Sequence, residues 1–316
     1  MTMYKTPLAG RLARPELLEL LDRSRDFLLT LLLAPAGFGK STLLSQWLQQ
    51  LGDRQYVHIC LTRRDRDATR CLQKLNEALR NSLPGFSVMP CNALNAELEQ
   101  AALFAGSLVE ALTRVNHDFY IVIDDFHYAS AALVQNIFSQ LIAELPSHIH
   151  LLIASRSHPG FSLSRLKLED RLLLIDSHDL RLPADNFAEL CQLLQQPALE
   201  PTESAALLQM TEGWMAGIKL ALLARGRTGH LLPRDFHGNQ PEMVDYFVDV
   251  VLNELTPKLR DFLLNTAIFD QFDLSLCQSL LPAADCADTL EQIIQHGLFI
   301  MPVEDHAGFY RYHPLF

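Results

Sequence analysis

The chain has 316 residues, of which 49% are hydrophobic, and its formal net charge is −11. This length is enough for two or three globular domains. Because DNA binding needs clustered Lys and Arg, the negative net charge argues against DNA binding by this segment. No apolar run approaches a membrane span and no C-x-x-C pair occurs among the six cysteines, so we expect a cytoplasmic protein with reduced thiols and no membrane partner.

The first half of the chain alternates short apolar runs with amphipathic stretches of helical period. We expect strands at residues 27–33, 56–61, 119–123, 150–155 and 172–175, and helices at residues 42–51, 68–82, 94–115 and 131–145. Such alternation predicts a parallel sheet that is covered by helices on both faces. The first domain is therefore expected to be an α/β domain of residues 1–182.

The second half changes to mostly helical patterns. Helices are expected at residues 186–194, 204–210 and 214–224, with a linker at 226–241, and together they form a predicted helical domain of residues 183–240. Further helices are expected at residues 243–255, 257–267, 274–281 and 287–296, followed by apolar runs at 299–301 and 309–312. Helices followed by such a hairpin predict a winged-helix domain at residues 241–316. Because it lacks a basic recognition helix, we do not expect it to bind DNA.

Residues 34–41 read Ala-Pro-Ala-Gly-Phe-Gly-Lys-Ser between the first strand and the first helix, as in a phosphate-binding loop. Backbone N–H groups of such a loop converge on phosphates, Lys40 reaches the same phosphates, and the Ser41 hydroxyl is a Mg²⁺ ligand. The pattern departs from its consensus at Ala34, and a chance Gly-Lys-Ser after a buried strand is the alternative interpretation. We predict a nucleoside triphosphate site formed by Ala36, Gly37, Phe38, Gly39, Lys40, Ser41 and Thr42. The predicted winged-helix domain is expected to close over this nucleotide.

Two carboxylates and an arginine follow later strands of the predicted sheet. Asp124 and Asp125 end the third strand, where Asp124 is expected to bind Mg²⁺ and Asp125 to orient or deprotonate the attacking water. Arg156 follows the fourth strand and is a candidate sensor of the γ-phosphate, with a surface arginine as the alternative. His127 is either a γ-phosphate contact or an ordinary polar loop residue.

These motifs, together with several further along, resemble the ATPase core of MalT-like large ATP-binding regulators of the LuxR type. That group lies within the signal-transduction ATPases with numerous domains. The matching stretches span nearly the whole chain and lie at residues 34–43, 46–47, 122–127, 155–156, 213–214, 262–264, 267–268, 297–299 and 312–316. The resemblance therefore implies an α/β P-loop NTPase with a parallel sheet, followed by a helical and a winged-helix domain. Ala34 agrees with this group, whose loop begins with a small residue, Pro, Ala and Gly.

The resemblance implies a nucleotide switch with weak ATPase activity. ADP holds a closed monomer, and ATP together with an inducer opens it for self-association. Lys40 and Ser41 would bind phosphate and Mg²⁺, Asp124 would bind Mg²⁺, and Asp125 would support hydrolysis. Arg156 would be the sensor. Arg14 would contact the adenine, and His313 would touch the ADP β-phosphate, with packing as the alternative for His313.

Members of this group continue into a helical-repeat sensor and a C-terminal helix-turn-helix. The resemblance therefore implies that inducer and DNA are bound through regions absent from this chain, and that an inhibitory protein is a further possible partner. We expect a fragment or a short natural relative. Two other classes stay open: a stand-alone P-loop enzyme such as an AAA-type ATPase or a nucleotide kinase, and an interaction module without turnover. The steady-state ATPase rate separates them.

Overall fold

The structure is a computed structural model that describes residues 12–51, 55–88, 98–228, 241–281, 286–295, 299–303, 306 and 308–316. It divides into two compact units. The sheet unit contains Arg14–Ala34 and Lys40–Asp179, whereas the helical unit includes Pro35–Gly39 and Leu180–Phe316. The predicted boundaries of three domains, at residues 1–182, 183–240 and 241–316, stay a prediction.

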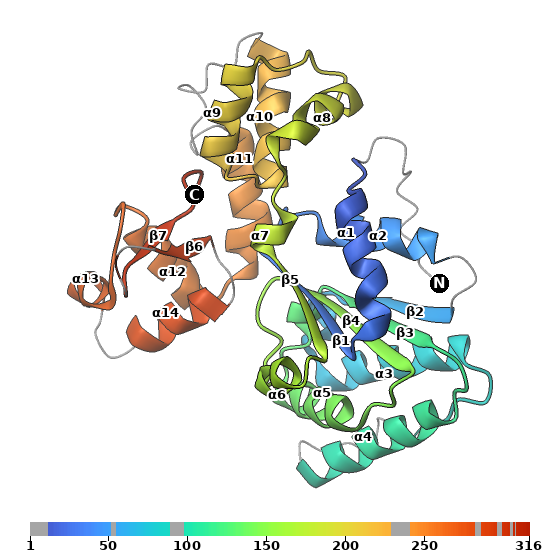
Figure 1. Cartoon of the computed structure of the whole chain (residues 1–316). Coiled ribbons are helices and arrows are strands. Elements are labelled where there is room, and N and C mark those ends of the chain that lie inside the picture. Colours follow the sequence, from blue (N-terminus) through green and yellow to red (C-terminus); the bar gives the residue numbers. More distant parts are fainter. Residues whose placement is uncertain are drawn as a thin grey trace. The chain divides into compact units, whose positions relative to one another are not determined.

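The sheet unit is built on five parallel strands in the order β2-β3-β4-β1-β5 (Figure 1). Their bounds are β1 (Leu29–Leu33), β2 (Gln55–Cys60), β3 (Phe119–Asp124), β4 (Ile149–Ser155) and β5 (Leu172–Asp176). Every residue of β3 and β4 is buried, as expected for inner strands with both faces covered. The predicted strands and the α/β fold class are confirmed. Because all strands are parallel, the loops that follow β1, β3 and β4 begin at one edge of the sheet.

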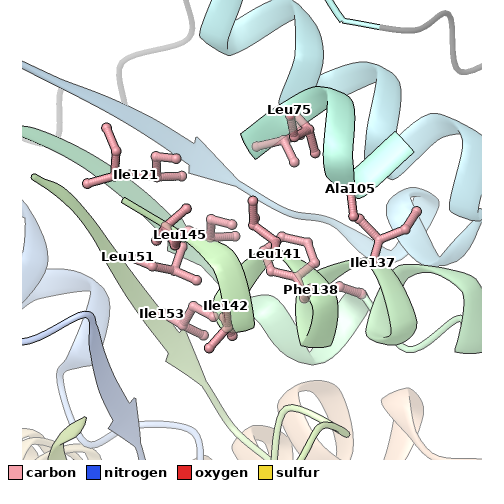
Figure 2. Packing of buried hydrophobic residues seen from close by; sticks show 14 of the residues in the cluster. Leu75, Ala105, Ile121, Ile137, Phe138, Leu141, Ile142, Leu145, Leu151 and Ile153 are labelled. Atoms are coloured by element: carbon pink, nitrogen blue, oxygen red, sulfur yellow. The ribbon is translucent and has the colours of Figure 1, made fainter. Parts of the chain in front are cut away.

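One face of the sheet carries α3 (Ala68–Ser82), α4 (Leu98–Thr113) and α5 (Ala132–Glu144), which share a large hydrophobic core with the strands. Figure 2 shows part of this core, where buried side chains include Leu141, Ile142, Leu145, Ile121, Leu151 and Ile153. The helix α3 has the bounds that the sequence predicts. The predicted helix at 94–115 is confirmed from Leu98 to Thr113, two residues short of its predicted end, and residues 94–97 lie outside the described residues.

The opposite face carries α1 (Pro15–Asp22) and α2 (Lys40–Gln50). The Trp47 ring of α2 meets the Tyr120 ring of β3 edge-on, with centroids 5.5 Å apart. Tyr120 and its neighbour Ile121 point to opposite faces, since side chains alternate along a strand. The Trp47 indole also donates a hydrogen bond of 3.0 Å to Asp22 at the end of α1. This contact ties α1 to the helix that follows the phosphate loop.

The helical unit begins with α8 (Phe187–Leu193), α9 (Pro201–Thr211) and α10 (Met215–Thr228), and continues with α11 (Pro241–Tyr246). Its core surrounds Trp214, which is fully buried. The predicted linker at 226–241 is wrong at both ends, because Gly226 lies within α10 and Pro241 begins α11. A glycine costs a helix about 1 kcal/mol, and the buried face of α10, with Ile218 and Leu222, outweighs that cost. Residues 229–240 lie outside the described residues.

The C-terminal part has a smaller core of its own. It consists of α12 (Pro257–Thr266), α13 (Leu274–Leu280), α14 (Cys286–Gln295) and an antiparallel pair of strands, β6 (Ile300–Pro302) and β7 (Tyr310–Tyr312). Three helices and a hairpin confirm the predicted winged helix. The predicted helix at 243–255 is α11 followed by a π-helical turn, Phe247–Val251, and a 3-10 turn, Leu252–Glu254. Within the described residues, no helix is long and apolar enough to cross a membrane.

Candidate functional site

The loop at residues 34–41 leaves β1 and enters α2 at Lys40, two residues before the predicted helix start. Gly37 and Gly39 adopt φ angles of 83° and 86°, in the left-handed region that favours glycine. Ala34 is 2% exposed and does not have a positive φ, so the consensus glycine is not required there. The loop therefore delivers the chain to a helix N-terminus, where unpaired backbone N–H groups favour an anion.

The remaining loop residues differ in exposure. Ala36 is buried, and Phe38 is half-buried against the hydrophobic cluster of the helical unit. Ser41 is exposed and Thr42 is half-buried, both in the first turn of α2. Their hydroxyls thus lie at the helix end where a phosphate-bound cation would be held, and the Mg²⁺ role of Ser41 stays a prediction.

Lys40 is the most perturbed cation of this site. Its side chain is buried, and its ammonium donates a hydrogen bond of 2.6 Å to the carbonyl oxygen of Ala34. Burial and the charge of Arg156 together lower the pKa of Lys40 to about 8, although the charges of Asp124 and Asp125 oppose the shift. A desolvated ammonium beside a second cation favours an added anion, because the anion would restore the interactions lost with water.

Asp124 is the last residue of β3 and is 5% exposed. Its Oδ1 accepts a hydrogen bond of 2.9 Å from the N–H of Asp125, which adopts a left-handed φ of 55°. The left-handed turn directs the chain away from the strand directly after Asp124, so the paired carboxylates stand at the carboxyl edge of the sheet. The ligand atoms of Asp124, Asp125 and Cys60 lie within 4.8 Å of one another.

The carboxylate oxygens of this cluster are suitable ligands for Mg²⁺. Two carboxylates, with the Ser41 hydroxyl as a predicted third ligand, are hard oxygen donors of the kind that Mg²⁺ prefers. Cys60 does not belong to such a set, because burial and the two nearby carboxylates raise the pKa of its thiol to about 11. A protonated thiol is a poor ligand for a hard cation. Asp124 therefore has the environment expected of the predicted Mg²⁺ ligand.

Asp125 lies between two basic side chains. Its Oδ1 is 4.0 Å from Nε of Arg156 and 3.8 Å from Nδ1 of His127. Arg156 directly follows β4, so the parallel sheet brings it to the same edge as the carboxylates. Asp125 and His127, from the loop after β3, are thus close to Arg156, from the loop after β4. Their roles in hydrolysis and in sensing the γ-phosphate stay predictions.

Arg14 lies directly before α1, and its carbonyl oxygen accepts the N–H groups of Leu17 and Leu18 at 3.1 and 3.0 Å. The side chain is half-buried. Burial lowers the pKa of its guanidinium, and Glu16 partly opposes the effect. This environment suits a cation that is shielded from water, and the contact with adenine stays a prediction.

His313 is 5% exposed, and the backbone of the helical unit engages both of its ring nitrogens. Nε2 lies 3.0 Å from the carbonyl oxygen of Thr211, and Nδ1 accepts a hydrogen bond of 3.2 Å from the N–H of Leu315. A carbonyl oxygen only accepts, so Nε2 carries the imidazole proton and donates it to Thr211, whereas Nδ1 is the acceptor for the Leu315 N–H. The packing alternative for His313 has direct support here, and its contact with a phosphate stays a prediction.

Two residues of interest were missed as site residues by sequence analysis. Cys60 pairs in register with Asp124 on the neighbouring strand, a position that follows from strand order once β2 and β3 are known to be adjacent. Trp214 donates its indole hydrogen bond to the carbonyl oxygen of Ala36 at 2.9 Å, from 178 residues further along the chain. No local pattern indicates that contact.

The chain matches two families of known domains. Residues 8–154 match the AAA ATPase domain, and residues 248–316 match the MalT winged helix domain. It is 29% identical over 98% of its length to the HTH-type transcriptional regulator MalT of Cronobacter sakazakii. It is 26% identical over 98% of its length to the regulator of the same name from Vibrio cholerae. In both cases the chain spans 35% of the length of the relative.

Among solved structures, a STAND protein with a tetratricopeptide repeat sensor from Pyrococcus horikoshii aligns with 96% of this chain and 41% of its own. The sequence identity is 14% and the TM-score is 0.41. The chain is thus similar to MalT transcriptional regulators over nearly its whole length, and its match to an AAA ATPase domain precedes its match to a MalT winged helix domain.

Proposed function

We propose that this chain is the nucleotide-dependent switch of a MalT-like transcriptional regulator, and that it binds ATP or ADP with Mg²⁺. The observation that supports this best is the buried Lys40 ammonium, which has a pKa lowered to about 8 and follows two left-handed glycines at the start of a helix. An ammonium held out of water at such a helix end is suited to a polyphosphate, whose charge compensates the lost hydration.

The roles of the other residues follow from their places at the sheet edge. Ser41 and Asp124 are the proposed Mg²⁺ ligands, and a bound Mg²⁺ would neutralise charge that develops between the β- and γ-phosphates. Asp125 is the proposed acceptor for the proton of the attacking water. Arg156 lies 4.0 Å from Asp125, so a guanidinium that moves to a γ-phosphate would also change the surroundings of the base. This link gives a physical reason for slow and regulated hydrolysis.

The switch itself is proposed as an equilibrium between two forms. ADP favours a closed monomer, and ATP favours a form that associates with further copies. A nucleotide can shift such an equilibrium only by its different affinities for the two forms. Inducer, DNA and any inhibitory protein would act through parts of the regulator that this chain does not include. The alternatives are a stand-alone AAA-type ATPase, which would turn over rapidly, and a module that binds nucleotide without hydrolysis.

Titration calorimetry with Lys40→Ala tests the proposal. Loss of a charge-assisted contact is expected to weaken ADP and ATP binding by at least about tenfold. Lys167→Ala is the matched control, because Lys167 is an exposed lysine of α6 (Ser164–Leu168) in the same unit. Equal affinities of the parent and Lys40→Ala would overturn the proposal. In the parent, steady-state turnover above about one per second would favour the stand-alone enzyme.

A further inference from the structure

Two consecutive carbonyl groups of the phosphate loop are held by the start of α10. The Trp214 indole N–H donates to the carbonyl oxygen of Ala36 at 2.9 Å, and the backbone N–H of Ala216 donates to that of Gly37 at 3.0 Å. Both partners belong to the helical unit, which includes Pro35–Gly39. We call this pair of hydrogen bonds the loop clamp.

The clamp fixes the direction of the N–H groups as well as that of the carbonyls. No peptide bond in the described residues is cis, and in a trans peptide the C=O and the following N–H point in opposite directions. With the carbonyls of Ala36 and Gly37 directed at Trp214 and Ala216, the N–H groups of Gly37 and Phe38 point away from them. Consecutive N–H groups with one direction form a concave site for an anion.

Gly37 is required for the close approach on which the clamp depends. A Cβ atom at Gly37 would lie 2.6 Å from Nε1 of Trp214, 2.6 Å from Cβ of Ala216 and 2.7 Å from the Tyr246 hydroxyl. At Gly39, which has nearly the same φ, a Cβ atom would meet no other atom within 4 Å. Position 37 therefore needs glycine for contact with the helical unit, in addition to backbone conformation.

The other sides of the Trp214 ring are packed by aromatic residues. Phe247 stacks on the indole with centroids 5.7 Å apart, and Phe299 and His313 meet it edge-on at 5.2 and 5.6 Å. The turn before Trp214 is also fixed, because Glu212 and Gly213 have positive φ and the Gly213 carbonyl oxygen accepts the N–H of Leu182 at 2.8 Å. The indole is thus held from several sides while its N–H reaches the loop.

We propose that Trp214 is a positioning residue for the phosphate loop, whose indole N–H holds the 36–37 peptide so that the Gly37 N–H meets the nucleotide phosphates. The Phe38 N–H beside it is directed by the bond from the Ala216 N–H to the Gly37 carbonyl oxygen. The proposal rests on the proposed nucleotide binding by this loop. It goes further by making the helical unit a source of nucleotide affinity. It also links the nucleotide to the aromatic cluster of Phe247, Phe299 and His313, because phosphate binding polarises the peptide that Trp214 contacts.

The first test compares ADP affinities by calorimetry. Trp214→Phe keeps an aromatic ring but loses the N–H donor, and it is expected to weaken ADP binding by about five- to tenfold, the value of one hydrogen bond. Phe247→Leu is the matched control, since it loosens the same cluster and leaves the clamp intact. An affinity of Trp214→Phe within twofold of the parent, or equal losses in both variants, would overturn the proposal. Lys40→Ala is measured in parallel, and only its failure to weaken binding would overturn the proposed function.

The second test is spectroscopic and does not depend on the stability of Trp214→Phe. The chain has two tryptophans, so Trp47→Phe leaves Trp214 as the only indole. Saturating ADP is expected to shift the emission of this variant, because the carbonyl that accepts the indole N–H becomes more polar. Biosynthetic replacement of Trp214 by 3-benzothienylalanine in the same variant keeps the bicyclic shape without the N–H, and should weaken ADP binding as Trp214→Phe does. Unchanged emission with unchanged affinity of the benzothienyl form would overturn the proposal.

Discussion

The Lys40 ammonium donates a hydrogen bond of 2.6 Å to the carbonyl oxygen of Ala34, six residues earlier in the chain. The loop of residues 34–41 therefore folds back on its own start, and this hydrogen bond holds the Lys40 ammonium in place. Only 7% of Lys40 is exposed, so protein atoms, among them this carbonyl oxygen, take the place of most of the water that would surround a free ammonium. Such an arrangement stores an unfavourable desolvation energy that a bound phosphate would relieve.

The first prediction concerns the pH dependence of the nucleotide-free protein. The pKa of Lys40 is 10.5 as a free side chain and about 8 in the folded chain. Between these values the unfolded state binds more protons, so the Lys40 contribution makes the free energy of unfolding rise as the pH increases from 8 to 10.5. Lys40→Met should remove this rise and stabilise the protein at pH 7 by up to roughly 3 kcal/mol. Urea unfolding of both proteins from pH 7 to 10.5 measures the difference, and parallel pH profiles would contradict it.

The second prediction separates binding from turnover at the paired carboxylates. Asp125→Asn keeps the size of the side chain but removes the base, so ATP should still bind while hydrolysis falls by about a hundredfold or more. Asp124→Asn should instead weaken the dependence of ATP affinity on Mg²⁺, because it removes a charged ligand. Single-turnover hydrolysis and ATP titrations with and without Mg²⁺ distinguish the two. Hydrolysis by Asp125→Asn at the parental rate would move the catalytic role to another residue.

The parts that the sequence predicts well are those whose signals are local. The strand from Phe119 to Asp124 and the helix from Ala68 to Ser82 follow from runs and periods of apolar residues, since these are the faces that the core buries. The closeness of Asp125 and Arg156 then follows from parallel strand order. The contact of Trp214 with the phosphate loop cannot be predicted in this way, because two turns that are unrelated in sequence meet only in the folded unit.

The sequence also failed to predict where one helix ends and where another becomes irregular. The expected linker began at Gly226 because residues 226–241 are rich in Gly, Pro and His, yet α10 continues to Thr228. The π-helical turn at Phe247–Val251 was also not predicted, since its extra residue per turn leaves no mark on the apolar pattern. In the second case the Phe247 ring of the turn stacks on Trp214, so tertiary packing contributes to the local structure.

The third prediction concerns a buried pair of hydroxyls in the winged helix. The Thr266 and Tyr312 oxygens are 2.7 Å apart, and Thr266 also donates to the carbonyl oxygen of Phe262 at 2.7 Å. Because the one hydroxyl hydrogen of Thr266 is used there, Tyr312 is the donor of the shared bond. Thr266→Val should lower the free energy of unfolding by about 1 to 3 kcal/mol, as it leaves a buried hydroxyl without its partner. Adding Tyr312→Phe should cost little more, and strictly additive losses in a double-mutant cycle would contradict the coupling.

The fourth prediction tests the proposed contact of His313 with ADP. If the imidazole contributes to the closed ADP form, His313→Ala should speed ADP release, measured by displacement of a fluorescent ADP analogue. His313→Gln is the control for packing, because its amide can donate to the Thr211 carbonyl and accept from the Leu315 N–H as the imidazole does. Equal off-rates for the parent, the alanine variant and the glutamine variant would leave His313 with a packing role alone.

The last prediction concerns the response of the helical unit to acid. Burial lowers the pKa of His313 below its ordinary value of 6.5. The hydrogen bond to Thr211 and the charge of Glu212 oppose this shift, whereas the nearby charges of Arg311 and Arg181 add to it. The unfolded state therefore takes up a proton at a higher pH than the folded state, so the free energy of unfolding falls as the pH drops below 6.5. Protonation would also remove the acceptor that Nδ1 offers to Leu315, because both nitrogens of an imidazolium are donors. Thermal unfolding between pH 7.5 and 5 should show a larger loss of melting temperature for the parent than for His313→Gln, and identical losses would show that His313 does not titrate on unfolding in this range.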